Sequence, residues 1–302
     1  MITLASDTLN SNCTNSTARR AESGGSTARR VDESGGLRPR HSALTRGLYR
    51  LRALVPAFAL ALTLVGAPSC QTVPITGRSA FNMFSVSQDM QLGAEAYQEI
   101  KQQNPLVTSG PQLEMVRRAM NNLVAAANEY DQGYEWEVEL IDDPQMVNAF
   151  ALPGGKMAVY TGILPVAGDE TGLAVVMGHE IGHVLGRHGT QRMSTEGLAS
   201  TAIQLMTSGE KAQLAGTVLG VLSLGYGRNQ ELEADHIGLI LMAKAGYDPR
   251  AAVTFWQRMM EGREGGGPEW LSTHPSGDRR IAQIESLLPE ALTYYQAGAA
   301  RP

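Results

Sequence analysis

The segment Val175–Gly189 reads VVMGHEIGHVLGRHG and contains the pattern H-E-x-x-H as His179, Glu180 and His183. On an α-helix, residues four apart lie one turn apart on the same face, so the two histidines can direct their imidazole nitrogens at one metal ion. Glu180 lies about 100° further round the helix, where its carboxylate can take a proton from a water molecule that the ion has acidified. The segment therefore predicts a hydrolase with one Zn²⁺ per chain and Glu180 as its general base.

A chance H-E-x-x-H, with two exposed histidines and a glutamate in a salt bridge, is the alternative interpretation. The flanking residues are apolar, which indicates a buried helix: Val175, Val176, Ile181, Val184 and Leu185. Two buried imidazoles beside a buried carboxylate cost free energy unless they bind a partner, so the flanks favour metal binding.

The same helix offers no clear third ligand. An enzyme with the pattern H-E-x-x-H-x-x-G-x-x-H would have its third histidine at position 189, which is Gly189, and His188 comes one residue early. If the helix continues, His188 lies about 140° from the ligand face, so we interpret it as a cation at the helix C-terminus and Gly189 as the stop. A thermolysin-like enzyme would have a glutamate at position 203, which is Ile203.

The segment Asn229–His236, NQELEADH, contains a better candidate for the third ligand. Glu231 and Asp235 share a helix face among apolar neighbours, so Glu231 would complete a His-His-Glu zinc site and Asp235 could orient a ligand imidazole. Glu233 points elsewhere, and we expect it in solvent or in a salt bridge. An acidic helix surface is the alternative for this pair. The ligand would then come from another acid: Glu196, Glu210 or Glu233.

Hydrophobic periodicity predicts a mostly helical α+β fold with a small sheet just before the metal-binding helix. The expected strands are Trp136–Ile141, Asn148–Leu152 and Lys156–Tyr160, with a turn at Pro153–Gly155. The expected helices are Ser87–Gln103, Pro111–Asn128, Thr171–Arg187, Asn229–Ala245, Pro249–Glu261 and Arg279–Leu288. Asp169 or Thr171 is the expected N-cap of the third helix, and a loop is expected at Gly265–Pro268. We also expect a hairpin of two helices within Gly197–Gly227, interrupted at Ser208–Lys211. Because an interior helix glycine costs about 1 kcal/mol relative to alanine, four glycines in the metal-binding helix predict that another element packs closely against it. They are Gly172, Gly178, Gly182 and Gly186.

The N-terminal part of the chain differs in composition from the rest. Residues 1–52 form a low-complexity leader, rich in Ser, Gly, Thr and Arg, that ends as the basic start of a signal peptide. Residues 53–69 form the hydrophobic region of that signal, shorter than the roughly 20 residues of a membrane span. We therefore expect export and a zinc metallopeptidase domain at 70–302. Cys70 directly follows the apolar segment, which favours lipidation of this cysteine and a membrane anchor of acyl chains.

Charge is unevenly distributed along the chain. Residues 1–70 hold 9 of the 25 Lys and Arg and 4 of the 30 Asp and Glu, so the remainder has 16 basic and 26 acidic residues. An acidic body is repelled by phosphates, so we expect no nucleic-acid partner.

Further motifs are Cys70–Arg78 (CQTVPITGR), Asn148–Gly155 (NAFALPGG), Glu231–Asp235 (ELEAD) and Thr273–Ile281 (THPSGDRRI). With H-E-x-x-H, they resemble a family of zinc endopeptidases that includes the CAAX prenyl protease, the membrane protease HtpX and bacterial periplasmic lipoproteins. The resemblance covers about residues 70–288 and implies a zincin-like gluzincin fold.

The resemblance to this family implies that Glu231 is the third zinc ligand and that Asp235 supports a ligand. It also implies that His274 donates a hydrogen bond to the oxyanion and that Arg280 supports the site. The interrupted hairpin at Gly197–Gly227 differs from the transmembrane helices of some members and argues against cleavage of prenylated proteins within a bilayer.

These observations predict a zinc metalloendopeptidase on the periplasmic side of the bacterial envelope, held there as an outer-membrane lipoprotein, that degrades misfolded or misassembled envelope proteins. Its expected partners are polypeptide substrates, the membrane and the outer-membrane assembly machinery. We expect the substrate to add a strand beside Asn148, Ala149, Phe150 and Ala151. The alternative is a chaperone-like outer-membrane assembly factor with a mainly structural zinc site.

Overall fold

The computed structural model describes residues 69–261, 269–274 and 278–299. The described residues from position 70 onward belong to one compact unit. The predicted leader 1–52, the hydrophobic region 53–69 apart from Ser69, and the loop predicted at 265–268 lie outside the described residues.

The described strands form two small sheets. The first pairs β1 (Ser69–Thr72) with β2 (Ser79–Asn82). The second contains β3 (Glu137–Ile141), β5 (Lys156–Tyr160) and β4 (Ala149–Ala151) in that order. β3 runs parallel to β5, whereas β4 is antiparallel to β5, with Phe150 opposite Ala158. The three predicted strands are thus confirmed, and β4 is an edge strand of the sheet.

Helices make up most of the described chain, which confirms the predicted fold class. They are α3 (Val86–Gln103), α4 (Pro111–Ala127), α5 (Leu164–Ala167), α6 (Glu170–Leu185), α7 (His188–Thr195), α8 (Ala199–Ser208), α9 (Lys211–Ser223), α10 (Arg228–Lys244), α11 (Ala251–Glu261), α12 (Trp270–Thr273) and α13 (Asp278–Ala299). Short 3₁₀ turns lie at Asn128–Tyr130, Pro153–Gly155 and Thr161–Ile163.

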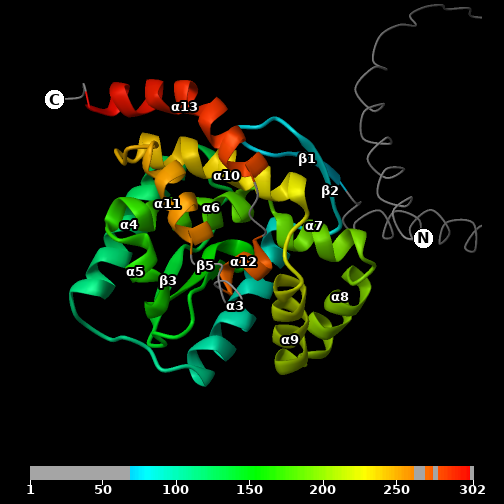
Figure 1. The fold of residues 1–302 in the computed structure, drawn as a ribbon. Coiled ribbons are helices and arrows are strands. Elements are labelled where there is room, and N and C mark those ends of the chain that lie inside the picture. Colours follow the sequence, from blue (N-terminus) through cyan, green and yellow to red (C-terminus); the bar gives the residue numbers. More distant parts are fainter. Residues whose placement is uncertain (1–68, 262–268, 275–277, 300–302) are drawn as a thin grey trace, which may run out of the picture. The chain divides into compact units, whose positions relative to one another are not determined.

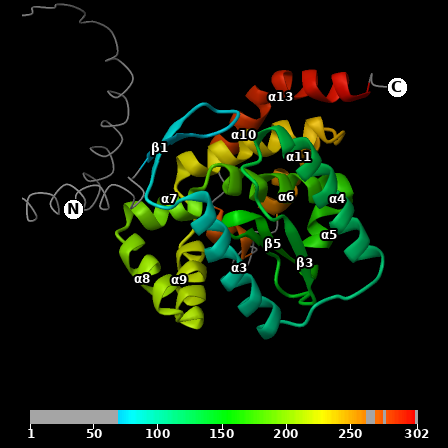
Figure 2. The same cartoon turned by 180° about the vertical axis from the view of Figure 1, so that it is seen from behind.

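Helix α6 packs against α4, α10 and α11 and contacts β4 (Figure 1). The reverse view shows the three-stranded sheet with α3 and α4 beside it (Figure 2). The Asp169 side chain accepts a hydrogen bond from the Gly172 N–H and caps α6, as predicted. This arrangement places the H-E-x-x-H helix between the sheet and α10.

The end of α6 differs from the prediction. The helix stops at Leu185, Arg187 takes a left-handed conformation with a φ of 50°, and α7 begins at His188. The Arg187 guanidinium is buried and bonds to Asp89 Oδ2 at 2.5 Å and to the Phe84 carbonyl at 2.6 Å, which holds the chain in this turn. His188 is therefore not a cation at the end of α6, and Gly189 lies inside α7 rather than stopping a helix.

Small residues allow α6 and α10 to pack backbone against backbone, as the glycines of α6 predicted. A Cβ on Gly182 would lie 2.6 Å from the Ala234 carbonyl oxygen, and a Cβ on Gly238 would lie 2.7 Å from the Gly178 carbonyl carbon. A real Cβ does not approach backbone atoms this closely. These contacts fix the separation of the two helices that carry the predicted metal ligands.

We expect Gly182→Ala to destabilise the fold, because the new methyl group must push α10 away from α6. Overpacking of this kind costs about 1–3 kcal/mol of unfolding free energy, measurable by thermal or urea denaturation. Gly220→Ala in α9 is the matched control, since a Cβ there meets nothing within 4 Å. Equal stability of the Gly182→Ala variant and the wild type would contradict the close contact.

Two predictions concerned the C-terminal half of the chain. The hairpin within 197–227 is confirmed as α8 and α9, and among the described residues no helix is both long and apolar enough to cross a membrane. Helix α13 extends past the predicted end at Leu288, although Pro289 removes one backbone donor. Ala291 is fully buried in the core, so tertiary packing continues the helix beyond the proline.

Candidate metal centre

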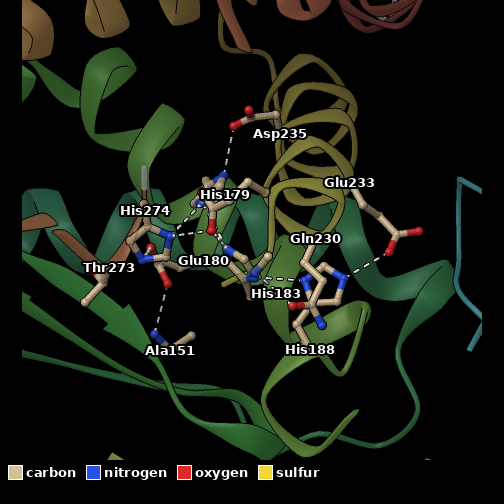
Figure 3. A network of polar contacts seen from close by, with 12 residues as sticks. Ala151, His179, Glu180, His183, His188, Gln230, Glu233, Asp235, Thr273 and His274 are labelled. Atoms are coloured by element: carbon tan, nitrogen blue, oxygen red, sulfur yellow. Dashed lines mark hydrogen bonds and ion pairs between the residues drawn. The ribbon is translucent and has the colours of Figure 1, made fainter. Parts of the chain in front are cut away.

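Four side chains from three parts of the fold meet at the buried face of α6, and Figure 3 shows the three histidines among them. His179 and His183 come from α6, Glu231 from the first turn of α10, and His274 follows α12. Each offers one nitrogen or oxygen atom, and these atoms lie within 4.8 Å of one another. The three predicted zinc ligands thus lie together, and His274 joins them as a fourth possible ligand.

The donor atoms suit a cation. Nδ1 of His179 lies 2.9 Å from Asp235 Oδ1. A carboxylate only accepts, so this nitrogen carries the hydrogen, and in a neutral ring Nε2 then presents a lone pair. That Nε2 faces Glu231 Oε2 at 3.5 Å and His183 Nε2 at 3.0 Å. Buried atoms whose lone pairs face one another need a positively charged partner. Imidazole nitrogen and carboxylate oxygen are ligands that Zn²⁺ binds.

Asp235 and Arg280 hold the outer side of the cluster. Arg280 donates from Nη2 to Asp235 Oδ1 and from Nη1 to Glu231 Oε2, both at 2.6 Å, and its guanidinium lies 3.8 Å from the Trp256 ring centroid. Burial raises the pKa of the Glu231 carboxyl, but the nearby His274 and the Arg280 guanidinium lower it by more, so this pKa is well below its ordinary value. The carboxylate of Glu231 is therefore kept ionised and in place.

Glu180 is buried with its carboxylate held at both oxygens. Oε2 accepts from the Ala151 N–H at 3.1 Å, and Oε1 accepts from Trp270 Nε1 at 3.1 Å. His274 Nε2 lies 3.3 Å from the same Oε1. The predicted general base thus lies between β4 and the metal-ligand cluster, with its orientation fixed.

The predicted supporting residues all lie at this site. His274 Nδ1 is 3.1 Å from Glu231 Oε1 and 3.1 Å from His179 Nε2, so its imidazole is within reach of both the ligands and Glu180. Its predicted role as donor to the oxyanion stays a prediction. Glu196 forms a surface pair with Arg192, and Glu210 is exposed, so neither alternative acid joins the cluster.

Three residues that contact the metal ligands or Glu180 were not predicted from the sequence. Tyr226 stacks on His183 with ring centroids 3.8 Å apart, and Trp270 donates to Glu180. His188 is fully buried, with Nδ1 2.8 Å from His183 Nδ1 and Nε2 2.9 Å from Glu233 Oε2. No motif marks the two aromatic residues. The role of His188 could have been predicted only if the sequence had shown that α6 ends at Leu185.

A cavity of about 150 Å³ opens beside the general base and His274. It is bounded by β4 on one side and by the end of α9 on the other. Its apolar lining comes from Phe150, Leu219, Leu222 and Tyr226. The candidate catalytic atoms therefore adjoin a space with mostly apolar walls.

Comparison with known proteins agrees with this geometry. Residues 112–288 match peptidase family M48. The chain belongs to this family. Over 227 residues it is 38% identical to mitochondrial metalloendopeptidase OMA1 of Schizosaccharomyces pombe, which covers 72% of this chain and 66% of that protein. The OMA1 of Saccharomyces cerevisiae is 31% identical, covering 74% and 70%. The β-barrel assembly-enhancing protease of Escherichia coli is 29% identical, covering 73% and 48%.

Membership in family M48 and the metalloendopeptidase relatives confirm the prediction of a zinc-dependent endopeptidase. The matched segments span between 48% and 70% of these three relatives. The special closeness to bacterial lipoproteins, the CAAX prenyl protease and HtpX stays a prediction.

The predicted localisation on the periplasmic side of a bacterial outer membrane is wrong. The OMA1 relatives of this M48 chain, from fungi, a plant and animals, are named as mitochondrial. An Arg-rich and Ser-rich leader is also typical of mitochondrial transit peptides, so composition did not distinguish the two destinations. Lipidation of Cys70, which lies in β1, depended on export and stays a prediction.

Proposed function

We propose that this M48 peptidase cuts extended segments of unfolded or misassembled proteins, which it binds as an added strand along β4. The supporting observation is that β4 is an edge strand of the described sheet and lies beside the general base. The Asn148 carbonyl accepts from the Tyr160 N–H and the Leu152 N–H donates to the Lys156 carbonyl, so these alternate residues bond to β5. Between them the main chain of Ala149 and Ala151 faces away from β5, where the Ala151 N–H donates to Glu180 and the Ala149 N–H donates to Asn148 Oδ1. A substrate strand would use main-chain hydrogen bonds, which require no particular side chains.

The residues of the site have separate tasks in this proposal. A zinc ion held by His179, His183 and Glu231 would polarise the scissile carbonyl and make an attacking water acidic. Glu180 takes the proton of the attacking water and passes it to the leaving nitrogen. His274 Nε2, which lies beside Glu180, donates to the oxyanion. Arg280 touches Glu231 and Asp235, so it positions the ligands from the outer side.

The apolar cavity beside Glu180 supports a preference for apolar side chains next to the cleaved bond. We expect Leu222→Gln to lower kcat/KM for peptides with Leu or Phe at that position by at least about tenfold, and to leave peptides with small residues there nearly unaffected. Sequencing the cleavage products of a peptide mixture measures this preference. Leu224→Gln is the control, because Leu224 is 62% exposed and does not line the cavity. An unchanged preference in the Leu222 variant would remove the cavity from substrate selection.

An assembly factor whose zinc is mainly structural is the second candidate. It is favoured by one observation, the relative from Escherichia coli that is named as assembly-enhancing. The buried carboxylate of Glu180 beside the ligands favours the peptidase, because a structural zinc site needs no general base.

A further inference from the structure

We infer that His188 and Glu233 determine which nitrogen of the zinc ligand His183 carries its hydrogen, and that the connection between β1 and β2 holds this pair in place. The inference rests on the zinc site proposed above. It assigns His188 and Glu233 as positioning residues, since neither is within the ligand cluster.

The hydrogen-bond chain has only one consistent direction. Glu233 Oε2 lies 2.9 Å from His188 Nε2, and a carboxylate only accepts, so His188 Nε2 carries a hydrogen. In a neutral ring His188 Nδ1 is then an acceptor, and it lies 2.8 Å from His183 Nδ1. His183 must donate from Nδ1, which leaves the lone pair of its Nε2 directed at His179 and Glu231. This relay, the hydrogen-bonded chain of Glu233, His188 and His183, thus leaves Nε2 of His183 available to bind a metal ion.

Contacts from the N-terminal hairpin hold Glu233. Thr76 Oγ1 donates to Glu233 Oε1 at 2.5 Å, and Arg78 Nε donates to Oε2 at 2.7 Å. Both residues lie in the connection between β1 and β2, which Figure 1 shows beside α10 and α7. Glu233 therefore has a salt bridge, one of the two environments predicted for it. The hairpin is linked through Glu233 and His188 to a metal ligand.

The turn after α6 is built to admit the His188 ring. A Cβ on Gly186 would lie 2.4 Å from His188 Nε2 and 2.8 Å from two ring carbons. Gly186 has an ordinary helical φ of −72°, so an alanine there meets no backbone strain. The glycine at this position thus leaves the space that the buried imidazole occupies.

The two zinc ligands of α6 are supported differently. His179 donates directly to the Asp235 carboxylate, whereas His183 reaches its carboxylate through a second imidazole. Loss of an outer hydrogen-bond partner of a metal-bound histidine typically lowers metal affinity about 10–100-fold. We expect His188→Phe to have this effect, because phenylalanine fills the space without accepting a hydrogen bond.

The test measures the zinc dissociation constant of the full chain by competition with a chelator, beside a thermal melt of each variant. His188→Phe and Gly186→Ala should bind zinc about 10–100-fold more weakly than the wild type. His188→Asn should recover most of the affinity, since its amide oxygen can accept from His183 Nδ1. Recovery by asparagine distinguishes positioning from simple packing, which the smaller side chain would not restore. Gly216→Ala in α9 is the matched glycine control, because its Cβ meets nothing within 4 Å.

Each outcome decides the question. Unchanged zinc affinity in both His188→Phe and Gly186→Ala, beside a wild type that binds zinc, would overturn this inference and leave the proposed function standing. Equal losses in His188→Phe and His188→Asn would also overturn it. A wild-type chain that binds no zinc would overturn the proposed function together with the relay.

Discussion

Replacement of Glu180 by Gln is expected to lower kcat for casein hydrolysis by about 10²–10⁴-fold, because the amide cannot take the proton from the attacking water. Zinc content should remain at one ion per chain, since Glu180 is outside the group of four possible ligands. The amide oxygen can still accept from either Ala151 N–H or Trp270 Nε1, so the fold should persist. Proteolysis and metal analysis on the same preparation measure both effects.

Glu196→Gln is the control for this variant, because Glu196 is a partly exposed acid paired with Arg192 on α7. Undiminished casein cleavage by the Glu180→Gln variant would eliminate Glu180 as the base. The same variant separates the two candidate functions. If it still replaces the wild-type protein in cells that lack it, the assembly role does not need catalysis.

Replacement of Glu231 by Ala is expected to weaken zinc binding by more than about 100-fold, beyond the roughly 10–100-fold that loss of an outer partner costs. The substitution removes one of three predicted ligands and also leaves Arg280 Nη1, buried at 2.6 Å from the lost oxygen, without that acceptor. Peptidase activity should fall with zinc content. Chelator competition gives the affinity, and a melting curve shows how far stability falls.

Glu210→Ala is the control, because it also removes an acid that follows the H-E-x-x-H motif in the sequence. Glu210 is exposed at the start of α9 and does not join the cluster. Full zinc affinity in Glu231→Ala would reassign the third ligand. Glu233 would be the acid to test next, although it is bonded to His188 and Arg78 rather than to the cluster.

The sequence was most informative where chemistry and helix geometry coincide. The four-residue spacing of His179 and His183 and the acids of NQELEADH were enough to predict that α6 and α10 face each other. The glycines of α6 predicted the close approach. The strands before the motif were also predictable, because alternation and the Pro-Gly-Gly turn are local signals.

Features that depend on contacts distant in sequence could not be predicted in this way. The end of α6 depends on the burial of Arg187 against Asp89, 98 residues away in the sequence. Likewise, Trp270 reaches Glu180 across 90 residues and His188 reaches Glu233 across 45. Periodicity describes one element at a time, so it cannot show which side chain from another element will fill a space.

Arg280 gives the site a charge balance. Three buried carboxylates, Glu180, Glu231 and Asp235, face one guanidinium and the ligand imidazoles, which are neutral when they bind a metal. Together these groups carry a net charge of minus two, which one divalent cation cancels. A monovalent ion would leave a negative charge in a region of low dielectric constant, and a trivalent ion would leave a positive one, so either costs electrostatic free energy. We therefore expect Arg280 to favour a divalent ion at this site, and coordination geometry to discriminate among divalent ions.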